Sequence, residues 1–426
     1  MRRSLVTAVL AAAIPVLIAS PASPAPTVPP ASADQADEPE DRAGYRQIAD
    51  ELDLTRVVPA LQAAFGARYG GYWMEVRRRD DVMHVGVVGA TAADRTTVAR
   101  ITGRHARVVT DPVDFGYDEL TAAHQEVAAS LGPASGHFTV ETDVATNRVV
   151  VRAQGADLAG TRATARDAAR RSARKSNRPD HAPDHAADAI EVVPAWSIDL
   201  DLLGPTDATV PAGATRGTFP PYEAGLGIRV YVGSVIYSCT TGYLFSSGFG
   251  LFGSTAGHCG RVGGGVVIGS RIVDSIRLNT YHSDPVVRAD VGMTSLSVLR
   301  WPSRPYIHGQ GGHRIVRTRF ANAQLSVGLR LCFEGLSSNG GNCGNVVRAN
   351  STICCDGAGH AFVFTCIGFP SIAGDSGGPV YYPEPNSRAV AAGMLSAAVT
   401  INGARSMCFT TVANIEARTG ATIVRG

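Results

Sequence analysis

Two patterns of apolar and polar positions divide the chain near residue 225. Upstream, apolar residues recur at helical spacing over 45–65 and 117–131, and alternating apolar runs lie beside these segments. Downstream, short apolar or alternating runs recur about every ten residues and are separated by Gly, Asn, Pro and Ser. The first pattern predicts a mixed α+β unit. The second predicts an all-β barrel or sandwich with one short helix over 412–419.

The upstream α+β unit contains two similar predicted hairpins. Apolar runs on either side of Asp80-Asp81 predict one hairpin over 70–88, and runs around Ala145-Thr146-Asn147 predict another over 136–151. Helical segments at 92–103 and 117–131 lie between the two hairpins. This order suggests an internal duplication within a domain that we place at residues 34–155.

The composition changes over residues 156–224. Seven basic residues stand between Arg162 and Arg178, and the run Asp180–His185 follows them. The basic run has no interleaved aromatic residues and borders an acidic stretch, which disfavours a nucleic-acid site. We interpret 156–224, which ends in a proline-rich stretch, as a solvated linker that contains a processing site. The Asp180–His185 run is not interpreted as a metal site.

The first 33 residues have the order of a secretory signal. Arg2 and Arg3 precede the apolar run Leu5–Ala19, and a stretch of small residues follows. The apolar run is shorter than the ~20 residues that a bilayer helix needs, so we expect no membrane contact once the signal is removed. The sequence therefore predicts a signal peptide and leader at 1–33 and a secreted, extracellular product.

Cysteine content and charge differ between the two halves. All eight cysteines lie at or after Cys239, and an even number of cysteines in an exported chain indicates disulfides. The net charge is +2 over 426 residues, which gives no general reason to expect a nucleic-acid partner. The charge is nevertheless −6 upstream of Gly225 and +8 from Gly225 onward, where the chain has arginine but no lysine. Opposite charges of this kind favour contact between the two halves.

The sharpest chemical motif is Gly-Asp-Ser-Gly-Gly-Pro at Gly374–Pro379. A serine hydroxyl is a poor nucleophile near neutral pH, so it needs a base to take its proton and amides to hold the oxyanion. Glycines allow the tight turn that aims successive N–H groups at one point. The motif also fits the nucleophile elbow of α/β-hydrolases, but that fold places its acid and its histidine after the serine. No His or Asp follows Ser376, so the base must lie upstream.

The segment Thr255–Cys259, which reads Thr-Ala-Gly-His-Cys, supplies the base as His258. A third group must orient the imidazole and stabilise its charged form. Asp290 lies between the histidine and the serine in the chain and heads a strand-like run, which suits a carboxylate held at a strand end. Asp274 and Asp284 are competitors for this role.

The order His258, Asp290, Ser376, with both motifs intact, resembles the chymotrypsin-like serine peptidases, and most of all their secreted bacterial branch of streptogrisins and α-lytic protease. Residues 331–346 resemble a cysteine-bridged hairpin of that branch, and Thr146–Val151 resembles a strand of its inhibitory propeptide. The resemblance covers 225–426 well and 41–155 weakly. It implies an all-β fold of two six-stranded antiparallel β-barrels over 225–426, preceded by an α+β propeptide domain.

The same resemblance implies a role for each motif residue. Ser376 would attack the scissile carbonyl, His258 would move the proton, and Asp290 would orient His258. The backbone amides of Gly374 and Ser376 would form the oxyanion hole.

The resemblance also implies where the substrate binds. Ser396 would begin the strand that pairs with the substrate backbone. Ala397 and Ala398 follow it where the streptogrisins have glycines, so we expect a narrower pocket. The uncharged segment 367–373 would line that pocket, and Leu395 stands where glutamate-specific relatives have a histidine. We therefore expect cleavage after apolar or small residues rather than after Arg, Lys or Glu.

Three disulfides follow from the resemblance: Cys239–Cys259, Cys332–Cys343 and Cys366–Cys408. The adjacent Cys354 and Cys355 leave two alternatives. They could bridge each other, or one of them could replace Cys366 as the partner of Cys408.

The aspartate beside the nucleophile departs from the pattern of the relatives. In the bacterial branch this aspartate pairs with an arginine, whose position is Phe333 here. A buried, unpaired Asp375 would cost several kcal/mol. We therefore expect Arg330 to supply the missing donor.

The leading hypothesis is a secreted serine endopeptidase made as a zymogen, a monomer that acts on polypeptide substrates. Its own propeptide would assist folding and block the cleft. Two alternatives stay open: a catalytically silent binding relative and a serine esterase on the same fold. No cofactor is implied because deacylation needs only water, and no metal site is expected because the cysteines are assigned to bridges.

Overall fold

The computed structural model describes residues 47–77, 80–132, 135–155, 157–175, 183–202, 219–281, 287–309, 312–338, 341–356, 359–370 and 372–426. The signal peptide and leader expected at 1–33 lie outside these residues, and so does Asp284. Among the described helices, none is long and apolar enough to cross a lipid bilayer.

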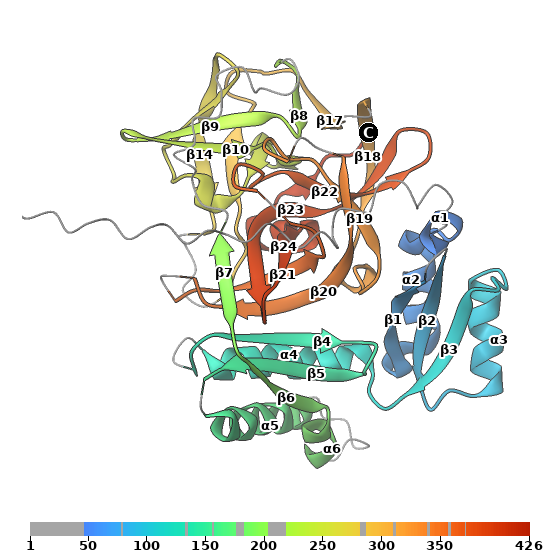
Figure 1. Ribbon diagram of the computed structural model, residues 1–426. Coiled ribbons are helices and arrows are strands. Elements are labelled where there is room, and N and C mark those ends of the chain that lie inside the picture. Colours follow the sequence, from blue (N-terminus) through green and yellow to red (C-terminus); the bar gives the residue numbers. More distant parts are fainter. Residues whose placement is uncertain are drawn as a thin grey trace, which may run out of the picture. The chain divides into compact units, whose positions relative to one another are not determined.

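The upstream domain repeats one order of elements (Figure 1). After α1 (Ile48–Glu51), the first copy runs α2 (Leu54–Phe65), β1 (Tyr69–Val76), β2 (Asp81–Val88), α3 (Ala92–Ile101) and β3 (Val108–Val113). The second runs α4 (Tyr117–Leu131), β4 (Phe138–Asp143), β5 (Arg148–Gln154), α5 (Leu158–Lys175), α6 (Pro183–Asp188) and β6 (Ile190–Ala195). In both copies a helix precedes an antiparallel hairpin, and a later strand pairs in parallel with the second hairpin strand. This shared order agrees with the duplication that the two hairpins suggest.

The helical pattern over 45–65 is interrupted once. The Asp53 side chain accepts a hydrogen bond from the Thr55 amide at 3.1 Å and caps the start of α2. The chain therefore forms two helices where the apolar spacing alone predicts one. The apolar face of α2, from Leu54 to Phe65, is buried against β1 and β2.

The α5 and β6 segments are packed against the upstream domain. Ala165, Ala168 and Ala169 are fully buried in the same apolar cluster as residues of α4. On the outer face, Arg171 and Lys175 form ion pairs with Glu126 of α4, at 3.4 and 2.7 Å. The structure here differs from the solvated linker expected over 156–224. The arginines form the exposed face of an amphipathic helix, and its small buried face gives a weak hydrophobic signal.

The downstream domain contains two β-sheet systems in which most neighbouring strands are antiparallel. Strands of the first are β9 (Gly227–Val232), β10 (Val235–Thr240), β11 (Leu244–Ser247), β12 (Gly250–Thr255), β13 (Gly265–Ile268), β14 (Arg271–Asn279), β16 (Gly292–Ser295) and β25 (Thr422–Ile423). Their spatial order is β10-β9-β13-β14-β16-β12-β11-β25. The C-terminal strand therefore returns to the first sheet after the chain has built the second.

The second sheet system closes on itself. Its strands are β19 (Arg330–Phe333), β20 (Asn342–Cys354), β21 (Ala361–Ile367), β22 (Pro379–Glu384), β23 (Arg388–Ile401) and β24 (Ala404–Thr411). They follow the order β21-β24-β23-β22-β19-β20, and β20 pairs again with β21. This closure gives a six-stranded antiparallel barrel, as expected, and the helix predicted over 412–419 is α7 (Val412–Thr419).

The eight cysteines form four disulfides: Cys239–Cys259, Cys332–Cys343, Cys354–Cys355 and Cys366–Cys408. Three of these pairs match the expectation. The fourth decides between the alternatives for the adjacent cysteines, because Cys354 and Cys355 bridge each other and Cys408 keeps Cys366 as its partner.

The upstream and downstream domains share strands and an apolar interior. Strand β4 pairs antiparallel with β20, and β7 (Ile198–Leu202) pairs antiparallel with β23. One buried apolar cluster contains Val58 and Tyr72 from upstream together with Phe320, Leu331 and Phe409 from downstream. The two domains are thus folded onto each other through backbone hydrogen bonds and a continuous core.

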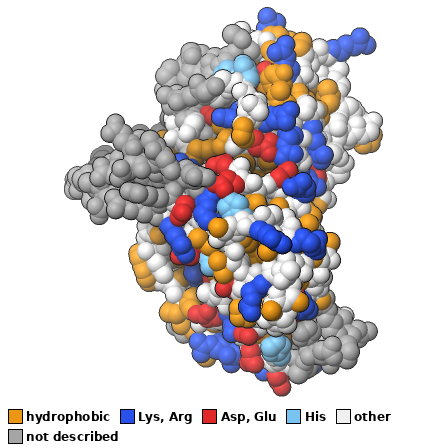
Figure 2. Space-filling model, turned by 90° about the vertical axis from the view of Figure 1, so that its right-hand side faces the viewer, with side chains coloured by type: hydrophobic (Ala, Val, Ile, Leu, Met, Phe, Trp, Pro, Cys, Tyr) orange, Lys and Arg blue, Asp and Glu red, His pale blue; other side chains and the backbone are white. Residues whose placement is uncertain are grey.

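Ion pairs across this boundary follow the charge difference between the halves. Upstream carboxylates meet downstream arginines at 2.9 Å for Glu141–Arg348, 3.1 Å for Asp201–Arg405 and 3.8 Å for Asp53–Arg317. On the face that Figure 2 shows, basic and acidic side chains are interspersed. These pairs agree with the expectation that opposite net charges favour contact between the two halves.

Gly393, inside β23, is expected to tolerate no side chain. A Cβ atom there would collide with the Phe409 ring and the Thr410 carbonyl oxygen. Gly393→Ala should therefore lower the free energy of unfolding by about 1–3 kcal/mol, because the crowded barrel must shift. Gly265→Ala is the matched control, since Gly265 also lies in a strand and has no atom within 4 Å of its Cβ position. Equal melting temperatures for the two variants would contradict this account of the barrel interior.

Candidate active site

His258 lies on a short 3₁₀ turn, Gly257–Cys259, directly after β12. The disulfide from Cys259 to Cys239 joins this turn to β10. The side-chain amide of Asn279 donates to the carbonyl oxygens of Gly257 and Gly260, both at 2.7 Å. The turn that carries the imidazole is therefore fastened on two sides.

Asp290 is fully buried in the segment that leads into β16. One of its carboxylate oxygens lies 2.7 Å from His258 Nδ1, and the other accepts a hydrogen bond from the His258 backbone amide at 2.8 Å. Both oxygens thus contact the same residue. This two-point contact sets the orientation of the ring and favours the tautomer with a proton on Nδ1.

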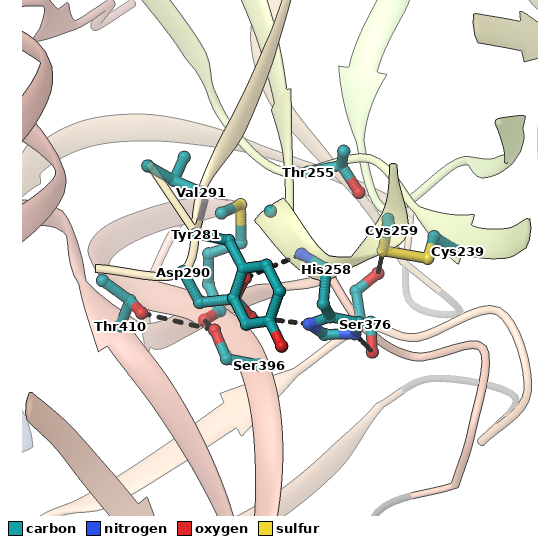
Figure 3. Close-up of polar contacts among 12 residues, drawn as sticks. Cys239, Thr255, His258, Cys259, Tyr281, Asp290, Val291, Ser376, Ser396 and Thr410 are labelled. Atoms are coloured by element: carbon teal, nitrogen blue, oxygen red, sulfur yellow. Dashed lines mark hydrogen bonds and ion pairs between the residues drawn. A yellow bond between two sulfur atoms is a disulfide. The ribbon is translucent and has the colours of Figure 1, made fainter. Parts of the chain in front are cut away.

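Ser376 lies on the other side of the imidazole, in the loop between β21 and β22. Its Oγ is 2.9 Å from His258 Nε2, and Figure 3 shows the three side chains in one line of hydrogen bonds. The Thr240 amide donates to the Ser376 carbonyl oxygen, and the Thr240 hydroxyl donates to the Gly374 carbonyl oxygen, each at 2.8 Å. The serine loop is therefore held by β10, the strand that also holds the histidine turn.

Two glycines shape the serine loop. Gly374 and Gly377 have φ angles of +101° and +88°, which favour glycine over other residues. A Cβ atom on Gly374 would collide with Ser337, and one on Gly377 would collide with Thr240 and Thr255. The glycines of the motif are thus required by both conformation and space.

Asp375 is fully buried, and backbone amides satisfy its carboxylate. Ser337 and Ser338 donate their amides to one oxygen at 2.8 and 2.9 Å, and the Ile372 amide donates to the other at 3.4 Å. Burial raises the pKa of the Asp375 carboxyl, and these amides offset part of that rise. The donors found are thus amides of a neighbouring loop, in place of the Arg330 guanidinium that the sequence suggests.

The strand expected to bind substrate is covered by the upstream domain. Ser396 lies in β23 with its Oγ 3.3 Å from the hydroxyl oxygen of Thr410, next to the triad (Figure 3). The following residues, Ala397 and Ala398, pair with β24 on one side and with β7 on the other. Leu202 lies opposite Ala397, so the end of β7 reaches the position expected for a bound peptide.

The segment expected to line the substrate pocket begins with apolar residues of the barrel core. Ile367 is fully buried at the end of β21, and the Phe369 ring meets the Phe333 ring edge-on at 5.3 Å. The disulfide Cys366–Cys408 lies beneath, because Cys408 pairs with Ala397. Phe333, at the position where the relatives are expected to have an arginine, is fully buried in the same apolar cluster as Ile367.

Sequence reasoning missed two residues that support His258. Asn279 holds the histidine turn, as described above. The ring of Tyr281 meets the His258 ring edge-on at 6.4 Å, stacks on Phe362 and donates its hydroxyl to Asp356 at 3.1 Å. Neither residue lies in a sequence motif with the triad. Their role arises only in the folded chain, where the end of β14 and the residues after it lie against the histidine turn.

Asn279→Ala should destabilise the histidine turn. It would remove the Asn279 donor from the buried carbonyl oxygens of Gly257 and Gly260 and leave Gly257 with only the Gly260 amide at 3.3 Å, at an expected cost of about 1–3 kcal/mol in unfolding free energy. Asn345→Ala is the control, because its buried Oδ1 has no hydrogen-bond partner and its loss should cost less. Denaturant unfolding of both variants measures the difference. Equal stabilities would show that Asn279 does not hold the turn.

Comparison with known proteins found similar solved structures. No family model and no curated protein matches the chain. Solved structures similar to it include protease A of Thermobifida fusca, at 22% identity and a TM-score of 0.38, which covers 48% of this chain and 100% of that one. A chymotrypsin of Cellulomonas bogoriensis has 19% identity, a TM-score of 0.36, and covers 48% of this chain and 100% of its own. An α-lytic protease homologue, N4, has 17% identity, a TM-score of 0.36, and covers 47% of this chain and 97% of its own.

Proposed function

We propose that the protein is a secreted serine endopeptidase made as a zymogen. The observation that carries the proposal is the hydrogen-bonded line from Asp290 through His258 to Ser376, with distances of 2.7 and 2.9 Å. Four disulfides support an oxidising, extracellular environment.

The geometry suits acyl transfer to a serine. Ser376 Oγ attacks the scissile carbonyl carbon while His258 Nε2 takes the hydroxyl proton. Asp290 stabilises the imidazolium through Nδ1, and the imidazolium then protonates the leaving amine. The amides of Gly374 and Ser376 hold the oxyanion, and water attacks the acyl-enzyme with His258 again acting as the base.

The zymogen part of the proposal rests on β7. An extended substrate would bind by adding a strand to β23, and β7 already forms hydrogen bonds with Ala397–Ile401 of that strand. Asp201 of β7 also forms an ion pair with Arg405 at 3.1 Å. The upstream domain therefore acts as an inhibitor in cis, and a cut between β7 and β8 (Tyr222–Ala224) would separate it from the enzyme.

The lack of any charged residue in segment 367–373, which is expected to lie beside the scissile bond, supports cleavage after apolar or small residues. A charged substrate side chain that was desolvated there would find no opposite charge in this segment. Basic and acidic residues before the scissile bond are therefore poor substrates in this proposal.

A fluorophosphonate probe is expected to label Ser376 in the processed protein. Ser376→Ala should abolish labelling, and Asp290→Asn should lower kcat/KM on peptides by about 10⁴-fold because the imidazole loses the group that fixes its tautomer. Asp274→Asn is the matched control, since Asp274 pairs with Arg277 on the surface at 2.8 Å and should leave activity near wild type.

The alternatives give different results in the same assay. Folded, processed protein that is never labelled would mean a catalytically silent binding relative. Labelled protein that cleaves esters but no peptide would mean a serine esterase.

Acid is expected to release the upstream domain. His124 of α4 is buried at the boundary, 3.0 Å from the Thr142 hydroxyl and 2.9 Å from that of Thr352 in β20. Burial lowers the pKa of His124 from its ordinary 6.5 to about 4. The docked state thus requires the neutral imidazole, and between these two pKa values a fall in pH favours separation. Docking of the cleaved upstream domain should be about tenfold weaker, or more, at pH 5 than at pH 7.

His124→Gln tests this assignment. Glutamine can hydrogen-bond both threonines but does not titrate, so this variant should lose most of the difference between pH 7 and pH 5. Size-exclusion chromatography of the processed protein measures how much upstream domain is retained. An unchanged pH dependence in the variant would assign the effect to the boundary carboxylates, such as Glu141, instead of to His124.

A further inference from the structure

Three metal-ligating side chains meet outside the triad, at the end of a hairpin. Glu223 of β8 lies against His308 of β17 (Ser303–Gly309) and His313 of β18 (Gly312–Arg319). The Glu223 carboxylate is 2.9 Å from His313 Nδ1 and 3.7 Å from His308 Nδ1. One ligand atom from each residue lies within 4.8 Å of the other two.

Strand register explains why the three side chains share one face. His308 and His313 are directly opposite each other in the β17–β18 hairpin, and their rings lie 5.0 Å apart. Ala224 pairs with Ile307, and both are buried in the same apolar cluster. Because neighbouring residues of a strand point to opposite faces, Glu223 and His308 both lie on the other face.

The chemistry of this set favours a transition metal. Two imidazoles and one carboxylate are the donor set of open zinc sites, whereas Mg²⁺ and Ca²⁺ prefer oxygen ligands alone. Glu223 is only 4% exposed, and among the described residues its ion pairs are with these two histidines. A divalent cation would neutralise this buried charge. We propose that Glu223, His308 and His313 form a binding site for a divalent transition metal of the zinc type.

The site needs only a small adjustment to bind the metal. Zinc binds imidazole nitrogen and carboxylate oxygen at about 2.0–2.2 Å, so the ligand atoms must move slightly closer together. The His313 side chain is 51% exposed and can make this movement, whereas Glu223 is fixed in a buried strand. The exposed side of His313 leaves a fourth position for water.

The metal would fasten β8 to the β17–β18 hairpin. Strand β8 has only three residues and pairs in parallel with β17, which is a weak attachment by itself. This role rests on the proposed function, because a cut between β7 and β8 would make β8 the first described strand of the mature enzyme. Metal binding itself does not depend on the function.

The experiment uses the full chain carrying Ser376→Ala, so that it stays in one piece, after removal of metals with a chelator. Zn²⁺ is titrated by calorimetry, and Co²⁺ is added as a visible-absorbing probe. We expect one metal ion per chain and a higher melting temperature with Zn²⁺. His313→Ala should weaken Zn²⁺ binding at least about tenfold, because loss of a group that merely orients a ligand already costs about 10–100-fold.

Two further variants keep the result interpretable. Glu223→Gln removes the anionic ligand and should weaken Zn²⁺ binding as His313→Ala does. His84→Ala is the matched control: His84 contacts Asp111 at 2.7 Å and Glu75 at 3.1 Å, but this group has one imidazole and both of its ring nitrogens are engaged. The His84→Ala variant should bind Zn²⁺ as tightly as the parent chain does.

Three results would contradict the proposed metal site. They are the absence of Zn²⁺ binding by the parent chain, undiminished binding by both His313→Ala and Glu223→Gln, and equal loss of binding in His84→Ala. Fluorophosphonate labelling of the otherwise wild-type protein remains a separate readout, so failure of the metal site and failure of the peptidase are distinguishable.

Discussion

The contact of one buried carboxylate with one histidine is the constraint on which the site depends. Asp290 holds both the ring and the backbone of His258, so the imidazole can face Ser376 only if the loop into β16 and the turn after β12 are in place. Those two segments belong to the first sheet, and the serine loop belongs to the second. The fold therefore has to bring two separately built sheets together before the line of hydrogen bonds exists.

The same principle of shared backbone bonds joins the upstream domain to the downstream one. Strand β4 pairs with the end of β20, and β7 pairs with β23, the strand to which we propose that substrate binds. In the proposed zymogen, ordinary β-pairing would attach the upstream domain at one place and block substrate access at another. Ion pairs between upstream acids and downstream arginines accompany both contacts.

Local sequence signals predicted much of this arrangement. The barrel strands, α4 and α7 follow from periodicity, and the motifs around His258 and Ser376 select two residues that do lie together. The packed α5 was not predicted, because alanines give a weak apolar face and arginines dominate its composition. The sequence also did not predict the amide donors to Asp375 or the support that Asn279 and Tyr281 give to His258. It did not predict the cluster of Glu223 with His308 and His313 either. Each of these arises from segments that are distant in the chain, and no local spacing encodes such contacts.

The paired strands would have a consequence for the downstream domain if the proposed cut removed the upstream one. Loss of the upstream domain would turn two internal strands into edge strands, which are prone to pair with other chains. At β23 this open edge would be useful, because a substrate must pair there. At β20 it would be a liability, limited to the three residues Thr352–Cys354 that pair with β4. Because the contact with β4 is short and ends at the disulfide Cys354–Cys355, the mature protein would not expose a long unpaired strand edge.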